Sequence, residues 1–404
     1  MRMQWKVAAL AAALGMCGMA SGADKVRWDL PISTKKLDNG LTVVVSPDPS
    51  APVVGVGVVY GIGMRREPRN RTGFAHLFEH LMFEGSANAP EGVFDRVISG
   101  GGGRNNAFTR ADFTNYIEVA PSSSVEPILW LEADRMQLLD FKPETLKNQQ
   151  DVVKEEIRVN VKNQPYGGFM WIDIGQQAFS KWENNHDGYG SFQDLENASL
   201  DDVRAFHRDY YGPNNAVLSI AGDVTPEQGF ALAKRYFGDI PARPTPPRPD
   251  YTEGLNTKEI RLQQSDALAQ VPALAVGWKM PERGSRDQAP MAVLGALLAN
   301  GEASRLHQGL VKERQLALNV DSLYGLTSAW EYDGPTLFVV FAMYKPDHDA
   351  DAVLSGIDAE IARVASEGVD AATLARVKTQ LLAQWYDGLE MFLDRADALA
   401  KLQA

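Results

Sequence analysis

Hydrophobic residues follow two different periods along the first 240 residues of the chain. Short runs at 41–45, 53–59 and 216–223 are continuously apolar or alternate with polar positions, which predicts strands. Residues 124–139 and 143–161 repeat apolar positions every three or four residues, which predicts helices. This mixture of strands and helices predicts an α+β or α/β fold.

Residues 241–253 interrupt these patterns and are predicted to form a linker. Five of the nine residues at 241–249 are proline, a density that favours stiff and extended backbone. Beyond the linker the same order of patterns recurs, with predicted strands at 257–262, 274–278 and 336–342, a helical region at 288–317, and long helices at 350–367 and 371–385.

This repetition predicts a protein of α+β class with two homologous domains, at residues 23–240 and 254–404. Each domain is expected to be an α/β sandwich in which a mixed sheet carries helices on one face. The second domain has no counterpart of the strand at 216–223, so we expect it to be C-terminally truncated. The favoured explanation is a fragment of a longer product, and the alternative is that another chain completes the sheet.

The N-terminus has the pattern of a secretory signal peptide at residues 1–22. Arg2 and Lys6 precede an apolar run at 7–16, which is too short to cross a bilayer stably, and small residues follow it. We therefore expect a periplasmic or secreted protein without stable membrane insertion. Cys17 is the only cysteine, and we do not expect a lipid anchor there because Met16 is a poor fit before a lipidated cysteine.

The charge of the chain excludes one class of partner. Its 52 acidic and 40 basic residues give a formal net charge of −12 at pH 7. Nucleic acids and anionic lipids carry the same sign of charge and are poor partners for such a surface. With 45% hydrophobic residues the chain has enough apolar side chains to bury a core in each predicted domain.

The motif His76-Leu-Phe-Glu79-His80 is the strongest candidate for chemistry. Positions i, i+3 and i+4 of a helix share one face, so both imidazoles and the carboxylate point the same way. Two neutral imidazoles suit zinc, and the carboxylate can accept a proton from a water whose pKa the metal has lowered. The alternative is that His76 and His80 are ordinary helix residues.

A protein zinc site needs a further ligand, and Glu156 is the best candidate. It stands one turn after Val152 and Val153, on or near the apolar side of a predicted helix. The neighbouring Glu155 is rotated away from that side and should be more exposed. The alternative for Glu156 is an ion pair with Arg158.

Residues 71–86 (RTGFAHLFEHLMFEGS) and 152–158 (VVKEEIR) resemble motifs of the pitrilysin/insulysin family of zinc peptidases, in the branch that includes mitochondrial processing peptidase. The resemblance runs from about residue 34 to residue 223 and continues weakly to the end. It implies one zinc per chain, with ligands from two histidines and a later glutamate and with a glutamate general base. In this sequence the ligands are His76, His80 and Glu156, and the base is Glu79.

The resemblance also implies residues that support the reaction. In the family a strand beside the zinc pairs with the backbone of an extended substrate, and here that strand contains Asn105, Asn106, Ala107 and Phe108. The alternative is a flexible glycine turn followed by a plain strand. Gln149 stands where relatives often have a second glutamate, and its neutral amide tunes the ligands more weakly than a carboxylate would.

One feature of active relatives is missing from its expected place. They carry an arginine and a tyrosine, seven residues apart, that help to stabilise the oxyanion, whereas this chain has Val311 and Leu318 there. Neither side chain donates a hydrogen bond. We expect a second family subunit or a missing C-terminal half to supply the pair, and the alternative is that Arg314 substitutes.

These observations predict a zinc-dependent endopeptidase that hydrolyses short or unfolded polypeptides. The alternatives are a structural or assembly subunit of the same fold and a peptide-binding scavenger with slow turnover. The remaining histidines, His186, His207, His307 and His348, lack ligand spacing and are predicted to face solvent or cap local structure. Packing near the site is predicted for the aromatic residues Trp171, Trp182 and Tyr189.

Overall fold

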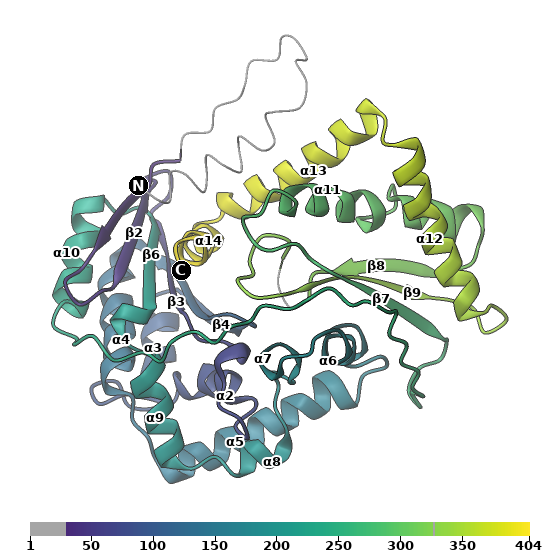
Figure 1. Cartoon of the computed structure of the whole chain (residues 1–404). Coiled ribbons are helices and arrows are strands. Elements are labelled where there is room, and N and C mark those ends of the chain that lie inside the picture. The colour runs from purple at the N-terminus through teal and green to yellow at the C-terminus, as the bar shows by residue number, and fades with distance from the viewer. Residues whose placement is uncertain (1–29, 326–327) are drawn as a thin grey trace, which may run out of the picture.

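The computed structural model describes residues 30–325 and 328–404 (Figure 1). The signal peptide predicted at residues 1–22 lies outside the described residues. Among the helices of the described part, none is long and apolar enough to span a bilayer.

The first half of the chain forms a six-stranded mixed sheet with the strand order β1-β2-β6-β3-β5-β4. Strands β2 and β6 are parallel, and the other neighbours are antiparallel. The central strands are rich in Val and Ile and almost fully buried, as strands covered on both faces should be. Their bounds are β1 Ser33–Lys36, β2 Thr42–Pro47, β3 Val53–Tyr60, β4 Arg104–Thr109, β5 Thr114–Pro121 and β6 Ala216–Gly222.

Helices cover one face of this sheet, and their ends follow from local sequence. Helix α9 begins at a capping box formed by Ser199 and Asp202, and α10 at one formed by Thr225 and Gln228. The helices of the first half are α2 Phe74–Leu81, α3 Val93–Gly100, α4 Val125–Leu138, α5 Pro143–Ile157, α6 Ile174–Ala178, α7 Trp182–Asn185, α8 Phe192–Glu196, α9 Leu200–Tyr210 and α10 Pro226–Phe237.

The second half repeats part of this arrangement. Its strands have the order β7-β9-β8, which matches the order β3-β5-β4 of the first sheet. The α+β class with a mixed sheet is therefore confirmed. The elements are β7 Ala273–Lys279, α11 Gln288–Ala299, β8 Asn319–Leu323, β9 Leu337–Met343, α12 Ala350–Glu367, α13 Ala371–Glu390 and α14 Phe392–Gln403.

One strand prediction for the second half is wrong. Residues 257–262 form no strand, and Ile260 and Leu262 are about half exposed. No neighbouring strand among the described residues pairs with this segment, so its backbone has no ladder to join. An apolar pattern alone does not make a strand without a partner.

Helix α14 comes from the second half of the chain but lies against the first sheet. In Figure 1 helix α13 leads toward α14, which packs beside β3 on the face opposite to α4 and α10. Leu399 and Ala400 join Val44, Val59 and Val217 in a separate buried cluster there. The sequence did not predict this additional layer, because the contact joins α14 to strands that lie between about 180 and 360 positions earlier in the chain.

Gly55 and Gly57 of β3 allow this close approach. A Cβ atom at Gly55 would lie 2.2 Å from the carbonyl oxygen of Phe392. We expect Gly55→Ala to lower the free energy of unfolding by about 1–3 kcal/mol, the usual range for overpacking, as measured by urea denaturation. Gly100→Ala is the control, because a Cβ atom there meets nothing within 4 Å. Equal stability of the two variants would contradict this account of α14.

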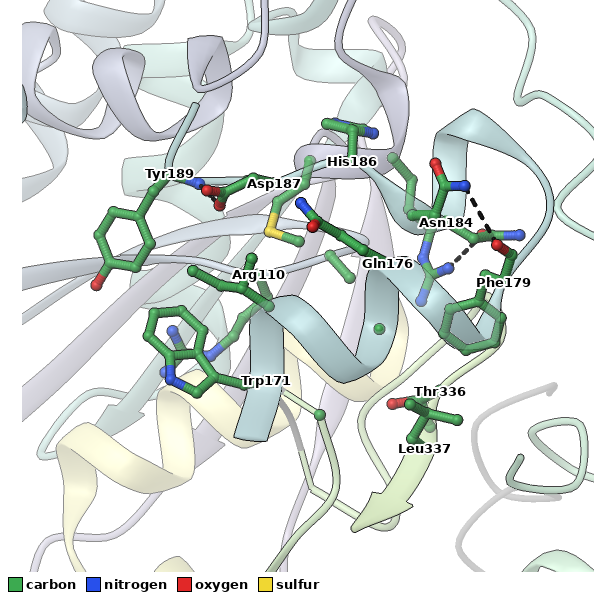
Figure 2. Close-up of a pocket in the computed structure, with 18 of the residues that line it drawn as sticks. Arg110, Trp171, Gln176, Phe179, Asn184, His186, Asp187, Tyr189, Thr336 and Leu337 are labelled. Atoms are coloured by element: carbon green, nitrogen blue, oxygen red, sulfur yellow. Dashed lines mark hydrogen bonds between the residues drawn. The ribbon is translucent and has the colours of Figure 1, made fainter. Parts of the chain in front are cut away.

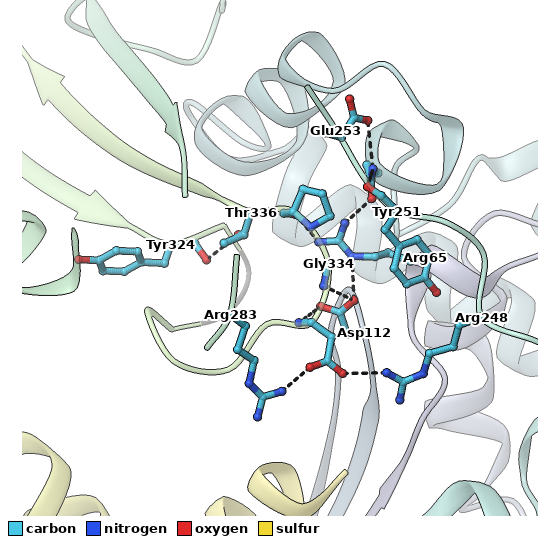
Figure 3. A network of polar contacts seen from close by, with 12 residues as sticks. Arg65, Asp112, Arg248, Tyr251, Glu253, Arg283, Tyr324, Gly334 and Thr336 are labelled. Carbon is cyan, nitrogen blue, oxygen red and sulfur yellow. Dashed lines mark hydrogen bonds and ion pairs between the residues drawn. The ribbon is translucent and has the colours of Figure 1, made fainter. Parts of the chain in front are cut away.

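A buried polar junction holds the two halves together (Figure 3). The Asp112 carboxylate accepts hydrogen bonds from the backbone N–H groups of Asp333, at 3.0 Å, and Gly334, at 3.2 Å. The same carboxylate forms an ion pair of 2.9 Å with Arg65. Arg248, from the predicted linker, binds Asp333 at 3.1 Å. The start of β9 is thereby fixed against the end of β4, where a cavity opens between the halves.

Candidate metal centre

Helix α2 carries the histidine motif and begins at Gly73, whose φ of 83° is left-handed and suits glycine. Its apolar side chains Phe74, Leu77 and Phe78 are buried in the main core. Gly73 has no side chain that could cap the helix, and Glu67 takes this role instead. The Glu67 carboxylate accepts hydrogen bonds from the backbone N–H groups of Gly73, at 2.9 Å, and Ala75, at 2.8 Å.

The three predicted metal ligands converge. The Nε2 atoms of His76 and His80 are 3.4 Å apart. Oε2 of Glu156, on α5, lies 3.5 Å from the first of these nitrogens and 3.2 Å from the second. A tetrahedral zinc ion with bonds of about 2.0–2.1 Å separates its ligand atoms by about 3.3 Å. The donor set and its spacing therefore fit zinc.

Electrostatics in the site favour an ionised Glu156. Hydrogen bonds from His76 and His80 hold the pKa of its carboxyl well below the usual range. Burial lowers the pKa of His76, but the hydrogen bond with Glu156 and the charge of Glu79 outweigh burial and raise it overall. The predicted exposure of Glu155 is confirmed, and Arg158 pairs with Glu155 at 3.0 Å rather than with Glu156. Asn160 donates a hydrogen bond of 3.3 Å to the other oxygen of Glu156.

Glu79 lines a cavity of about 290 Å³ together with His76 and Glu156. The cavity extends from the metal site toward the second sheet (Figure 2). Its apolar lining includes Trp171, Tyr189 and Phe179 from the segment after α5, and Leu337 and Val339 from β9. Glu79 therefore faces the same cavity as His76 and Glu156.

The predicted substrate strand is β4, at the edge of the first sheet and beside α2. Asn105, Asn106, Ala107 and Phe108 all lie on it, and Phe108 lines the cavity. Among the described residues only β5 pairs with β4, so its other edge has no strand partner. Asn105 is engaged with Asp95 at 3.0 Å. An edge of this kind offers backbone hydrogen bonds to an extended chain.

Gln149 is buried on α5 but interacts with a different partner from the three ligands. Its side chain is hydrogen-bonded to Glu84, which burial leaves with a raised pKa. Glu84 lies four residues after His80, just beyond the end of α2 at Leu81. Gln149 thus lies near the histidine helix without touching a ligand directly.

The prediction that the other histidines face solvent or only cap local structure is wrong for His186. Its side chain is 5% exposed, and its Nε2 lies 3.0 Å from the Glu67 carboxylate. The packing predicted for Trp171 and Tyr189 is observed, with their ring centroids 5.3 Å apart. Tyr189 also meets His76 edge to face at 5.1 Å. No local spacing in the sequence marks the pair of Glu67 and His186, because the two residues are far apart in the chain.

His207 is also buried, contrary to the same prediction. Its Nε2 faces the carbonyl oxygen of Arg135 at 3.3 Å, and its Nδ1 faces the guanidinium of Arg243 at 3.4 Å. One acceptor and one donor select a neutral imidazole. Burial and the charge of Arg243 accordingly lower the pKa of His207 to about 3.

This histidine should make folding sensitive to acid. A pKa of about 3 in the folded state lies below the ordinary value of about 6.5, so the stabilisation is complete above pH 6.5 and is lost as the pH falls toward 3. We expect the metal-free protein to lose about 2 kcal/mol between pH 6.5 and 5 through this group. Urea denaturation at both pH values should show this loss relative to His207→Phe. An identical pH dependence in the variant would refute the assignment.

The positions at which the family resemblance implies an arginine and a tyrosine, Val311 and Leu318, are not among the residues that line the cavity. Val311 packs against the second core, and Leu318 is 45% exposed. Arg314, the suggested substitute, forms an ion pair of 2.8 Å with Glu360 on α12. Arg314 is therefore committed to the second half and is not among the residues that line the cavity.

Two family models match the chain. The model described as "Insulinase (Peptidase family M16)" matches residues 42–167, and the one described as "Peptidase M16 inactive domain" matches residues 197–381. The zinc protease PqqE of Helicobacter pylori is 29% identical over 374 residues, which are 90% of this chain and 81% of that protein. The uncharacterized zinc protease YmxG of Bacillus subtilis is 28% identical over 305 residues, 73% of this chain and 70% of that protein.

Solved structures give the same comparison in three dimensions. A protease from Helicobacter pylori superimposes with a TM-score of 0.83 at 27% identity, covering 92% of this chain and 89% of that one. The first half of the periplasmic protease PqqL from Escherichia coli has a TM-score of 0.67 at 19% identity, covering 91% of this chain and 78% of that one. At that identity the second match speaks for the fold alone.

Proposed function

The chain belongs to the peptidase M16 family, and from this premise we propose that it is a zinc-dependent endopeptidase. The observation that carries the proposal is the convergence of His76 Nε2, His80 Nε2 and Glu156 Oε2 at 3.2–3.5 Å from one another. Three such donors leave one tetrahedral position open, which distinguishes a catalytic zinc site from a closed structural one.

The proposed mechanism assigns separate roles to the ligands and to Glu79. When bound, zinc lowers the pKa of a water and polarises the scissile carbonyl. Glu79 accepts the proton of the attacking water and delivers it to the leaving amine. With His76, His80 and Glu156 assigned as ligands, we assign this proton transfer to Glu79, which shares their cavity and lies on the same helix face as the two histidines.

The proposed substrates are short or unfolded polypeptides. An extended chain can pair with the free edge of β4 through its backbone, which tolerates different side chains. A folded protein does not fit a cavity of about 290 Å³ between the two halves. We propose that this activity takes place in the periplasm or outside the cell.

A partner is proposed for the oxyanion. Val311 and Leu318 supply no side-chain donor, and Arg314 is bound to Glu360. We propose that a second family subunit, or a further C-terminal half, contributes the arginine and tyrosine. The missing donors are also the observation that favours the alternative function, a peptide-binding or assembly subunit with little turnover of its own.

The test measures zinc content and cleavage of a quenched unstructured peptide, first with the chain alone and then with a second family member added. Zinc binding with multiple turnovers supports the endopeptidase, and activity only in the mixture supports the partner. Activity of the chain alone would remove the need for a partner. Stoichiometric zinc with less than one turnover would instead favour a peptide-binding subunit. The absence of both zinc and activity would favour an assembly subunit.

A further inference from the structure

The buried pair of Glu67 and His186 lies next to the metal centre, and the proposed mechanism does not use it. The Glu67 side chain has no exposed surface, and the His186 side chain is 5% exposed. The Glu67 carboxylate receives three hydrogen bonds, from the backbone N–H groups of Gly73 and Ala75 and from His186 Nε2 at 3.0 Å. A buried carboxylate that accepts three hydrogen bonds cannot move without breaking them, so the position of Glu67 is well defined.

Both ring nitrogens of His186 face acceptors. While Nε2 faces Glu67, Nδ1 lies 2.8 Å from the carbonyl oxygen of Trp182. An imidazole that donates from both nitrogens is a cation, so His186 and Glu67 form an ion pair. The ring is also stacked on Trp182, with centroids 4.0 Å apart and an interplanar angle of 9°.

The pair joins two elements that surround the metal ligands. Glu67 binds the first turn of α2, where its negative charge also complements the positive end of the helix dipole. His186 begins the segment 186–190, of which residues 186–189 line the cavity (Figure 2). The Tyr189 ring of this segment contacts His76 edge to face.

Glycines bring the same two elements into backbone contact. A Cβ atom at Gly190 would lie 2.4 Å from the carbonyl oxygen of Thr72, and one at Gly73 would lie 2.5 Å from that of Tyr189. The backbone N–H of Ser191 donates to the Thr72 hydroxyl at 3.0 Å. The start of α2 and the segment 186–190 therefore pack directly against each other, and the Glu67 carboxylate is hydrogen-bonded to both.

We propose that Glu67 and His186 are positioning residues, which hold the start of α2 against the segment 186–190 so that the His76 imidazole is fixed in the orientation that binds zinc. This inference rests on the proposed function, because it assumes that His76 is a ligand. Residues that orient metal ligands from outside typically change metal affinity by about 10- to 100-fold when they are replaced.

The test compares zinc affinities by chelator competition at pH 7.5. His186→Phe keeps an aromatic ring but leaves Glu67 without its charged donor, and we expect zinc to bind about tenfold more weakly. His186→Gln keeps a donor toward Glu67 and should recover most of the affinity. The matched control is His207→Phe. His207 is also a buried histidine, and its ring stacks on Phe78 of α2, the helix that carries His76.

Thermal unfolding of each metal-free variant separates positioning from general damage. The proposal requires that His186→Phe lose zinc affinity and that His207→Phe keep it, whether or not either variant unfolds at a lower temperature. Wild-type affinity in His186→Phe overturns the proposal, as does an equal loss in the two phenylalanine variants. If the wild-type chain binds zinc but cleaves no peptide, either alone or with a second family member added, the proposed function fails while these zinc affinities still test the positioning pair.

Discussion

Glu79→Gln should bind zinc as tightly as the wild-type chain and lose nearly all hydrolysis. The amide has the size of the carboxylate but cannot accept the proton of the attacking water. General-base catalysis by a positioned side chain contributes about 10²- to 10⁴-fold to a rate, so kcat should fall by that factor or more. Zinc content and steady-state cleavage of an unstructured peptide measure the two effects separately.

A matched control for this experiment is Glu155→Gln. The Glu155 side chain is 62% exposed and pairs with Arg158 at 3.0 Å, away from the candidate ligands, so neither zinc nor activity should change. Loss of zinc from Glu79→Gln would contradict the assignment of Glu79 as the base, because a base that is not a metal ligand is not needed for zinc binding. Unchanged kcat with bound zinc would move the proton transfer to another group.

The second large effect is expected from His80→Ala, which should lose both zinc and hydrolysis. Its Nε2 lies 3.2 Å from Glu156 Oε2 and 3.4 Å from His76 Nε2, so its removal leaves two of the three donors. Two protein ligands are too few for a stable zinc site. Zinc content after dialysis should fall to background, and activity should fall with it.

Glu156→Gln extends this prediction to the second helix of the site. A neutral amide is a poor ligand for zinc compared with a carboxylate, so affinity should fall steeply. Glu155→Gln again provides the control, because it differs by one position and by about 100° around the helix. Retention of zinc by Glu156→Gln would mean that the carboxylate is not a ligand and would direct the search to another residue of the cavity.

Part of the candidate metal site could be predicted from the sequence because its geometry is local. His76, Glu79 and His80 share a helix face through their spacing alone. For Glu156 the apolar pattern was only half right, because Val153 is buried while Val152 is 41% exposed. The strands of the first sheet were likewise visible as apolar runs. Features that depend only on the helix or strand period can be predicted from a single sequence.

Other features depend on contacts between distant segments and leave no local pattern. Glu67 and His186 are 119 positions apart and form their pair only when the sheet and the cavity wall are assembled. His207 was expected to be exposed or to act as a cap, but it is buried between Arg135 and Arg243. The segment at 257–262 has the apolar pattern of a strand, but the pattern does not show whether a neighbouring strand is available to pair with it.

The position of α14 has a consequence for the order in which the protein folds. During synthesis the first sheet leaves the ribosome long before residues 392–403, which cover Val44, Val59 and Val217. Until they arrive, this apolar face is open to water and to other nascent chains, and pairings of such long sequence separation form slowly. Helix α2, with the candidate metal ligands His76 and His80, packs on the other side of the same sheet, so an incomplete chain can assemble that side while this face is still open.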